Sequence, residues 1–264
     1  MKRNALRGRR FFGAAAFVLA ACFASAGARA GDQAAPHPVV VEMFLSQSCP
    51  KSPKAAEFMT ELARRRDVVA IAWHVDYWDK IPSWKHGAWT DIFATPENGV
   101  RQKAYNKRIR GRGVVFTPQA VVGGLISDVG SRRLAVDEDI KTARKLDDEA
   151  NPAPPHLVFE RLSSEETNSL RVRVDKVARP YDVILVRFMK AAETRITGGD
   201  NAGAIFREAN IATGVEQLAE RQQGVGVFSF AAPRDDAMGC AVLVQEHGQG
   251  RIIAAQYCPA ARIE

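Results

Sequence analysis

Apolar and polar positions follow two different patterns along the chain, and the change falls near residue 155. Residues 39–45 and 68–75 are almost continuously apolar, as in strands that are covered on both faces. Between them, residues 55–66 carry apolar side chains at helical spacing and end in three arginines, which suit the negative end of a helix. Strand, helix and strand in this order predict two parallel strands joined by a right-handed crossover.

Residues 76–150 are predicted to add an insertion, two strands and a helix to this strand-helix-strand unit. Residues 76–113 are predicted to be an insertion with helical spacing around Val100, Ala104 and Ile109. Residues 114–129 read as two strands around a Gly-Gly turn, and residues 134–150 as a closing helix. We therefore predict a mixed sheet flanked by helices over residues 38–150.

Beyond the proline-rich residues 151–155, apolar residues alternate with polar ones, as in strands with one solvated face. The stretch from Leu170 to Val174 is the clearest case, because each of its apolar residues is followed by a charged one. Six such segments predict an all-β, sandwich-like domain over residues 156–264, with residues 197–214 as its longest connection.

The first thirty residues have the features of an export signal. A basic start precedes an apolar run and Ala28-Arg29-Ala30, a pattern for cleavage before Gly31. Arg9-Arg10 fits the twin-arginine export pattern, which leaves the route open, and Cys22 closes a stretch similar to a bacterial lipobox. We expect a periplasmic or secreted protein, with a lipid anchor at Cys22 as the alternative.

The net charge is nearly zero once the predicted leader, residues 1–30, is left out of the count. The chain has 37 Lys and Arg against 30 Asp and Glu, and six of the basic residues lie in residues 1–30. The remaining 31 basic residues nearly balance the acidic ones, so the charge gives no reason to expect a nucleic-acid partner. Membrane association is expected only through a lipid anchor.

Three cysteines lie beyond the leader. Cys240 opens one strand-like segment and Cys258 closes the next, so a hairpin between them would place the two cysteines opposite each other. In an oxidising compartment this predicts a disulfide, with two buried reduced thiols as the alternative. Cys49 is then left unpaired, and we expect it to be accessible.

Cys49 lies in SQSCPKSP, between a buried strand and the start of a helix. The free N–H groups and partial positive charge at a helix start favour thiolate over thiol. A thiolate attacks disulfides, peroxides or acyl groups. The position therefore favours thiol chemistry.

The strand, the Cys-x-x-Ser at a helix start, the second strand and Thr117-Pro118 before a further strand together resemble the thioredoxin fold. In that fold a cis-proline loop faces the reactive cysteine, which implies such a role for Pro118. The motifs SQSCPKSP, WHVDYWD, RQKAY, TPQAVV, GGDNAG and AVLVQ, in this order, resemble a secreted thioredoxin-like family known as domain of unknown function twelve twenty-three. The resemblance spans about residues 38–258.

The chain departs from the family pattern at Ser52, where the family has its second cysteine. Cys49 therefore has no resolving thiol within the motif, and its release from a mixed disulfide would need an outside thiol. His74 is a candidate base for Cys49, with Asp76 orienting it; the alternative is a structural corner. A metal site of Cys49, His74 and His86 lacks a recognisable spacing, and no metal or cofactor is expected.

Two functions remain open on the sequence. One is a monothiol thiol-disulfide oxidoreductase that acts through Cys49 on protein disulfides or small thiols. The other is a non-catalytic thioredoxin-like module that binds a protein partner. They differ in one respect that is measurable, the reactivity of Cys49.

Overall fold

The computed structural model describes residues 37–83, 86–163, 168–233 and 235–260. The predicted export signal and Cys22 lie outside these residues. In the part of the chain that is described, no helix is long and apolar enough to span a membrane.

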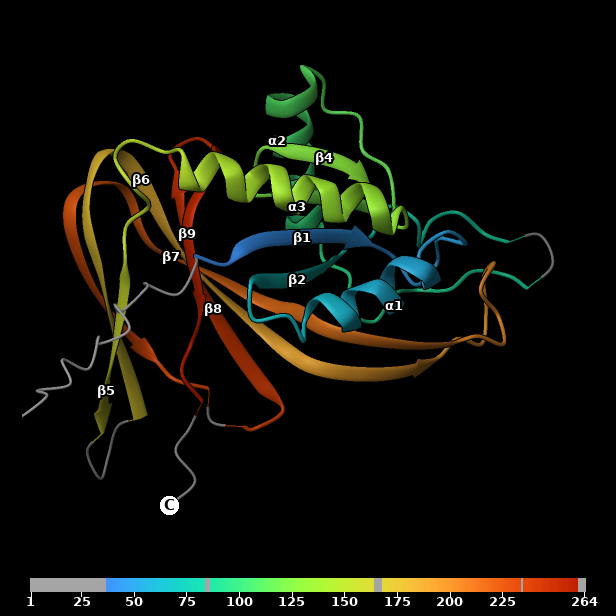
Figure 1. The fold of residues 1–264 in the computed structure, drawn as a ribbon. Coiled ribbons are helices and arrows are strands. Elements are labelled where there is room, and N and C mark those ends of the chain that lie inside the picture. The colour runs from blue at the N-terminus through green and yellow to red at the C-terminus, as the bar shows by residue number, and fades with distance from the viewer. Residues whose placement is uncertain (1–36, 84–85, 164–167, 234, 261–264) are drawn as a thin grey trace, which may run out of the picture. The chain divides into compact units, whose positions relative to one another are not determined.

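The described residues form one nine-stranded sheet with parallel and antiparallel neighbours (Figure 1). Its path runs β4-β3-β1-β2-β7-β6-β8-β9, and β5 pairs with β6 beside this path. β1 and β2 are parallel over their whole length, as their apolar patterns predict. The strands are β1 (Val39–Leu45), β2 (Val68–His74), β3 (Gln119–Val122), β4 (Ile126–Val129), β5 (Leu157–Ser163), β6 (Asn168–Arg195), β7 (Ile205–Ala231), β8 (Met238–Glu246) and β9 (Ile252–Tyr257).

Three helices cover the β1–β4 part of the sheet: α1 (Pro53–Leu62), α2 (Pro96–Arg110) and α3 (Arg133–Asp148). α1 and α3 lie on one face of this part of the sheet and α2 on the other (Figure 1). α1 and α3 share one apolar core with inward-facing residues of β1 and β2, and Tyr105 of α2 belongs to the core on the opposite face. This is the mixed sheet flanked by helices that the sequence predicts.

Two helices differ in detail from their predicted form. α1 ends at Leu62, before the three arginines, and Arg65 instead pairs with Asp67 and Asp137. α2 begins at a Thr95 cap and ends at Gly111 in the left-handed region, but Val100 on its predicted apolar face is 68% exposed. The buried face of α2 is mostly polar, because Gln102 and Asn106 donate hydrogen bonds to the buried side chain of Gln119 in β3.

The prediction that residues 197–214 form a long connection is wrong in part, because the chain is a strand from Ile205 onward. β7 reaches back to the first half of the chain and pairs with β2 at Ala72 and Ile211. Strands on both sides of residues 151–155 thus belong to one sheet, and β6 unites two segments predicted as separate strands. The division into domains 38–150 and 156–264 stays a prediction.

The predicted disulfide between Cys240 and Cys258 is confirmed. β8 and β9 pair antiparallel, which brings the two Cα atoms to 5.3 Å. Cys240 is buried in the core that β6, β8 and β9 share. The bridge therefore ties the end of β9 to the start of β8.

Replacing both bridge cysteines by alanine should lower the free energy of unfolding by about 3 kcal/mol, because an open chain gains entropy when the loop is no longer closed. The bridge spans 18 positions of sequence. Urea titration measures the loss, and a reductant should produce a similar loss in the wild type. An unchanged midpoint in the double variant would contradict the prediction.

Candidate functional site

The loop of residues 46–52 joins β1 to α1 as a tight turn. The N–H of Cys49 donates to the carbonyl of Ser46 at 3.1 Å, and the N–H of Ser52 donates to the carbonyl of Cys49 at 3.0 Å. The hydroxyl oxygen of Ser52 accepts from the N–H of Ser46 at 3.2 Å. Ser52 therefore closes the turn that presents Cys49.

Cys49 faces the loop before β3. β3 pairs antiparallel with β1, so Gln119 lies opposite Phe44 and the preceding Thr117-Pro118 lies beside the Cys49 turn. The Cys49 Sγ is 3.6 Å from the carbonyl oxygen of Thr117, and the Thr117–Pro118 peptide bond is cis. The structure thus brings together Cys49, Ser52 and Pro118 of the predicted site.

The expectation of an accessible Cys49 is wrong. Its side chain is completely buried, with 0% of its surface exposed. The segment after β2 contacts the turn, since Asp79 Oδ1 accepts from the Ser48 hydroxyl at 3.4 Å, and the apolar pattern alone does not reveal this contact. In this state the thiol donates to a backbone carbonyl and is shielded from solvent.

His74, the last residue of β2, lies between two buried carboxylates. Its Nδ1 is 2.8 Å from Asp91 Oδ2, and its Nε2 is 3.1 Å from Glu208 Oε1. Burial lowers the pKa of His74, but Glu208 and Asp91 outweigh it and raise the pKa to about 10. Both ring nitrogens of His74 thus face carboxylates, and its partners are Asp91 and Glu208 rather than Asp76. The role of His74 as a base for Cys49 stays a prediction.

The same two carboxylates hold the turn before Cys49. Asp91 Oδ2 accepts from the N–H of Gln47 at 2.7 Å, and Glu208 Oε2 accepts from the Gln47 side-chain amide at 2.8 Å. The Asn201 side chain donates to the carbonyls of Gln47 and Cys49 at 2.7 and 2.9 Å. The segment between β2 and α2, strand β7 and the connection between β6 and β7 therefore fix the position of Cys49 through one polar network.

Asp91, Glu208 and Asn201 were not predicted from the sequence. Glu208 lies in the segment read as a connection. Of the inward-facing residues Phe206, Glu208 and Asn210 two are polar, which hides the apolar-polar alternation of a strand. Asn201 lies in the GGDNAG motif, and membership of this motif is the one feature of the sequence that pointed to a role for Asn201. Gly198 and Gly199 of that motif lie so close to Ala88 and Trp89 that a Cβ would crowd them.

A second buried polar cluster explains two more motifs. Arg101 of RQKAY is paired with Glu42 at 2.6 Å, and the Tyr105 hydroxyl donates to the same carboxylate. Gln245 of AVLVQ donates to the Tyr105 hydroxyl at 2.9 Å. Burial lowers the pKa of Arg101, but Glu42 outweighs it and raises the pKa well above its usual value. This cluster joins α2, β1 and β8 and is structural.

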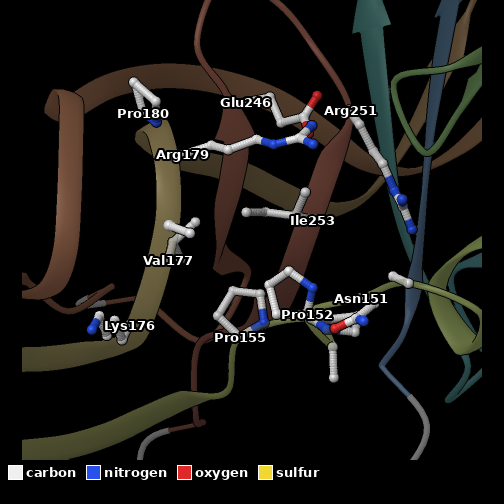
Figure 2. Close-up of a pocket in the computed structure, with 14 residues that line it drawn as sticks. Asn151, Pro152, Pro155, Lys176, Val177, Arg179, Pro180, Glu246, Arg251 and Ile253 are labelled. Carbon is white, nitrogen blue, oxygen red and sulfur yellow. The ribbon is translucent and has the colours of Figure 1, made fainter.

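A separate cleft of about 210 Å³ is lined mainly by residues 150–155 and 176–180, together with residues from the β8–β9 hairpin (Figure 2). Pro152, Pro155, Val177 and Ile253 form apolar walls, and Arg179 lies across one side (Figure 2). Neither Cys49 nor His74 lines it. Within the described ranges, no group of three or more His, Cys, Asp or Glu is placed to hold a metal ion.

A family model matches most of the chain, and two solved structures are similar in fold. The sequence model of the family described as "Protein of unknown function (DUF1223)" matches residues 40–245. A crystal structure of a protein from Agrobacterium tumefaciens is similar, with 21% identity and a TM-score of 0.68 over 86% of this chain and 96% of that one. The structure titled HBP35 of Porphyromonas gingivalis has 14% identity and a TM-score of 0.56 over 84% and 75%. The search of curated proteins gave no match.

Proposed function

The chain belongs to the DUF1223 family of proteins of unknown function, and on that premise we propose that it is an exported, thioredoxin-like monothiol exchange protein that acts through Cys49. The observation that carries the proposal is the placement of the Cys49 thiol beside Thr117, directly before cis Pro118. The parallel β1-α1-β2 unit and the antiparallel β3 supply the scaffold for this pairing.

The proposed reaction is a thiol-disulfide exchange with an outside resolving thiol. Cys49, after losing its proton to solvent, attacks one sulfur of a substrate disulfide; a new S–S bond forms, and the other sulfur leaves as a thiolate. A second thiolate from outside then attacks the mixed disulfide and releases Cys49 as a thiolate. Because Ser52 has a hydroxyl and no sulfur, the protein cannot complete this second step alone.

The alternative is a non-catalytic thioredoxin-like module of the cell envelope. One observation favours it, the complete burial of Cys49. The two proposals differ in whether the thiol reacts in the folded protein. Both functions include export by residues 1–30 and a sandwich-like domain over residues 156–264, which are proposals as well.

Restoring the second thiol tests whether the scaffold supports exchange. In the Ser52→Cys variant, Cys49 and the new cysteine should form a disulfide, and catalytic reduction of a protein disulfide by dithiothreitol should rise at least tenfold over the wild type. The matched control is Ser52→Ala, which also removes the hydroxyl that accepts from Ser46 but adds no sulfur. Equal rates for the two variants would contradict the proposal.

A further inference from the structure

Cys49 is completely buried, yet a thiol that exchanges with another molecule has to reach it. The residues that follow β2 contact both the turn that carries Cys49 and the loop that its thiol faces. Asp79 Oδ1 accepts from the Ser48 hydroxyl at 3.4 Å and from the N–H of Asp91 at 3.1 Å. This corner therefore contacts the residue that precedes Cys49.

The same corner contacts the residue that the thiol faces. The Trp78 indole N–H donates to the Thr117 hydroxyl at 2.5 Å, while the carbonyl of the same Thr117 accepts from the Cys49 thiol. The Tyr77 hydroxyl also lies against Thr117 and Gln102, and burial raises the pKa of Tyr77 to about 12. Cys49, Tyr77 and Trp78 thus converge on Thr117.

We propose that the corner of Tyr77, Trp78 and Asp79 is an internal cover of the Cys49 thiol, and that the hydrogen bond from Trp78 to Thr117 is one of the contacts that hold it closed. The inference rests on the proposed function and adds its regulation: exchange requires the corner to leave Thr117 so that a substrate disulfide can reach the Sγ.

The contacts of the corner are suited to opening without unfolding. Trp78 is half-buried, and the residues that follow it, Lys80, Ile81 and Pro82, are exposed, with Ile81 at 55%. The corner is held by three hydrogen bonds: Trp78 donates to Thr117, and Asp79 accepts from Ser48 and from the N–H of Asp91. Gln47 and Cys49 are held separately by Asp91, Glu208 and Asn201. Movement of the corner would therefore expose the thiol while the turn beneath it keeps its position.

The test compares two indoles near Cys49, one that donates to the loop facing the thiol and one that donates to the turn itself. Trp78→Phe removes the N–H that donates to Thr117, and the matched control Trp89→Phe removes the N–H that donates to Gln47 Oε1 at 3.2 Å. Iodoacetamide alkylation of Cys49 in the folded full chain, located by peptide mapping, should be about tenfold faster for Trp78→Phe, as expected for the loss of one hydrogen bond of ordinary strength. Trp89→Phe should stay within twofold of the wild type.

A second variant guards against an effect of the lost indole on folding. Thr117→Val removes the hydroxyl but keeps the carbonyl that faces Cys49, and it should give a similar increase; the Trp78→Phe/Thr117→Val pair should add little to either. Equal rates for Trp78→Phe and Trp89→Phe would overturn the proposal. So would an increase that only follows the loss of global stability in urea.

The alkylation rate reports access to the thiol and does not require exchange. Faster alkylation with no mixed disulfide to glutathione in any variant would support the cover and refute the proposed function. Mixed-disulfide formation with unchanged alkylation would do the reverse. The two proposals therefore fail separately.

Discussion

Replacing His74 by alanine should destabilise the protein by about 3–5 kcal/mol, because it leaves the buried carboxylates of Asp91 and Glu208 without their shared cation. His247→Ala is the matched control: its ring is 2.9 Å from Asp182, but it is 30% exposed, and its removal should cost less than about 1 kcal/mol. Urea titration at neutral pH measures both. Similar small losses would show that the His74 network contributes little.

The same network gives a pH dependence of defined sign. The pKa of His74 is raised by folding from 6.5 to about 10, so its stabilising contribution is fully present below pH 6.5 and is lost as the pH rises through about 10. The free energy of unfolding of the wild type should therefore fall over this range. In His74→Ala the fall should be absent, and a slope that persists in the variant would assign it to other groups.

Removing Arg101 should have an effect of similar size. Arg101→Met leaves Glu42, which is completely buried in β1, without its cation, and should cost about 3–5 kcal/mol. Arg65→Met is the control at a more exposed pair, where the loss should stay below about 1 kcal/mol.

A double variant separates charge from packing at this site. Adding Glu42→Gln to Arg101→Met should recover more than half of the loss, because no uncompensated carboxylate is then buried. Arg101 also lies over the rings of Trp73 and Tyr105, at 5.2 and 5.1 Å from their centroids. If the second substitution restored nothing, these ring contacts rather than the charge would carry the effect.

Where burial followed from apolar patterns, the sequence was a reliable guide. The continuous apolar runs of β1 and β2 predicted their parallel pairing, and the hairpin of β8 and β9 predicted the disulfide. Both inferences use patterns of elements that are close in sequence. The family resemblance added the placement of Pro118 opposite Cys49.

The polar interior could not be predicted in the same way. Glu208 is far from His74 in sequence and Asp91 is 17 positions away, and nothing in the local pattern of either marks it as buried. Only the pairing of β2 with β7 brings Glu208 to the site. α2 likewise buries Gln102 and exposes Val100, the reverse of the apolar rule. The burial of Cys49 depends on such long-range contacts, which explains why an accessible thiol was expected.

Incubation of the folded full chain with glutathione disulfide tests the central claim most directly. Peptide mapping should find one glutathione on Cys49, slowly formed in the wild type, absent in Cys49→Ser and removed again by reduced glutathione. A Cys49 that stays unmodified over hours, and also in the more accessible Trp78→Phe variant, would contradict exchange through this thiol and favour the non-catalytic module.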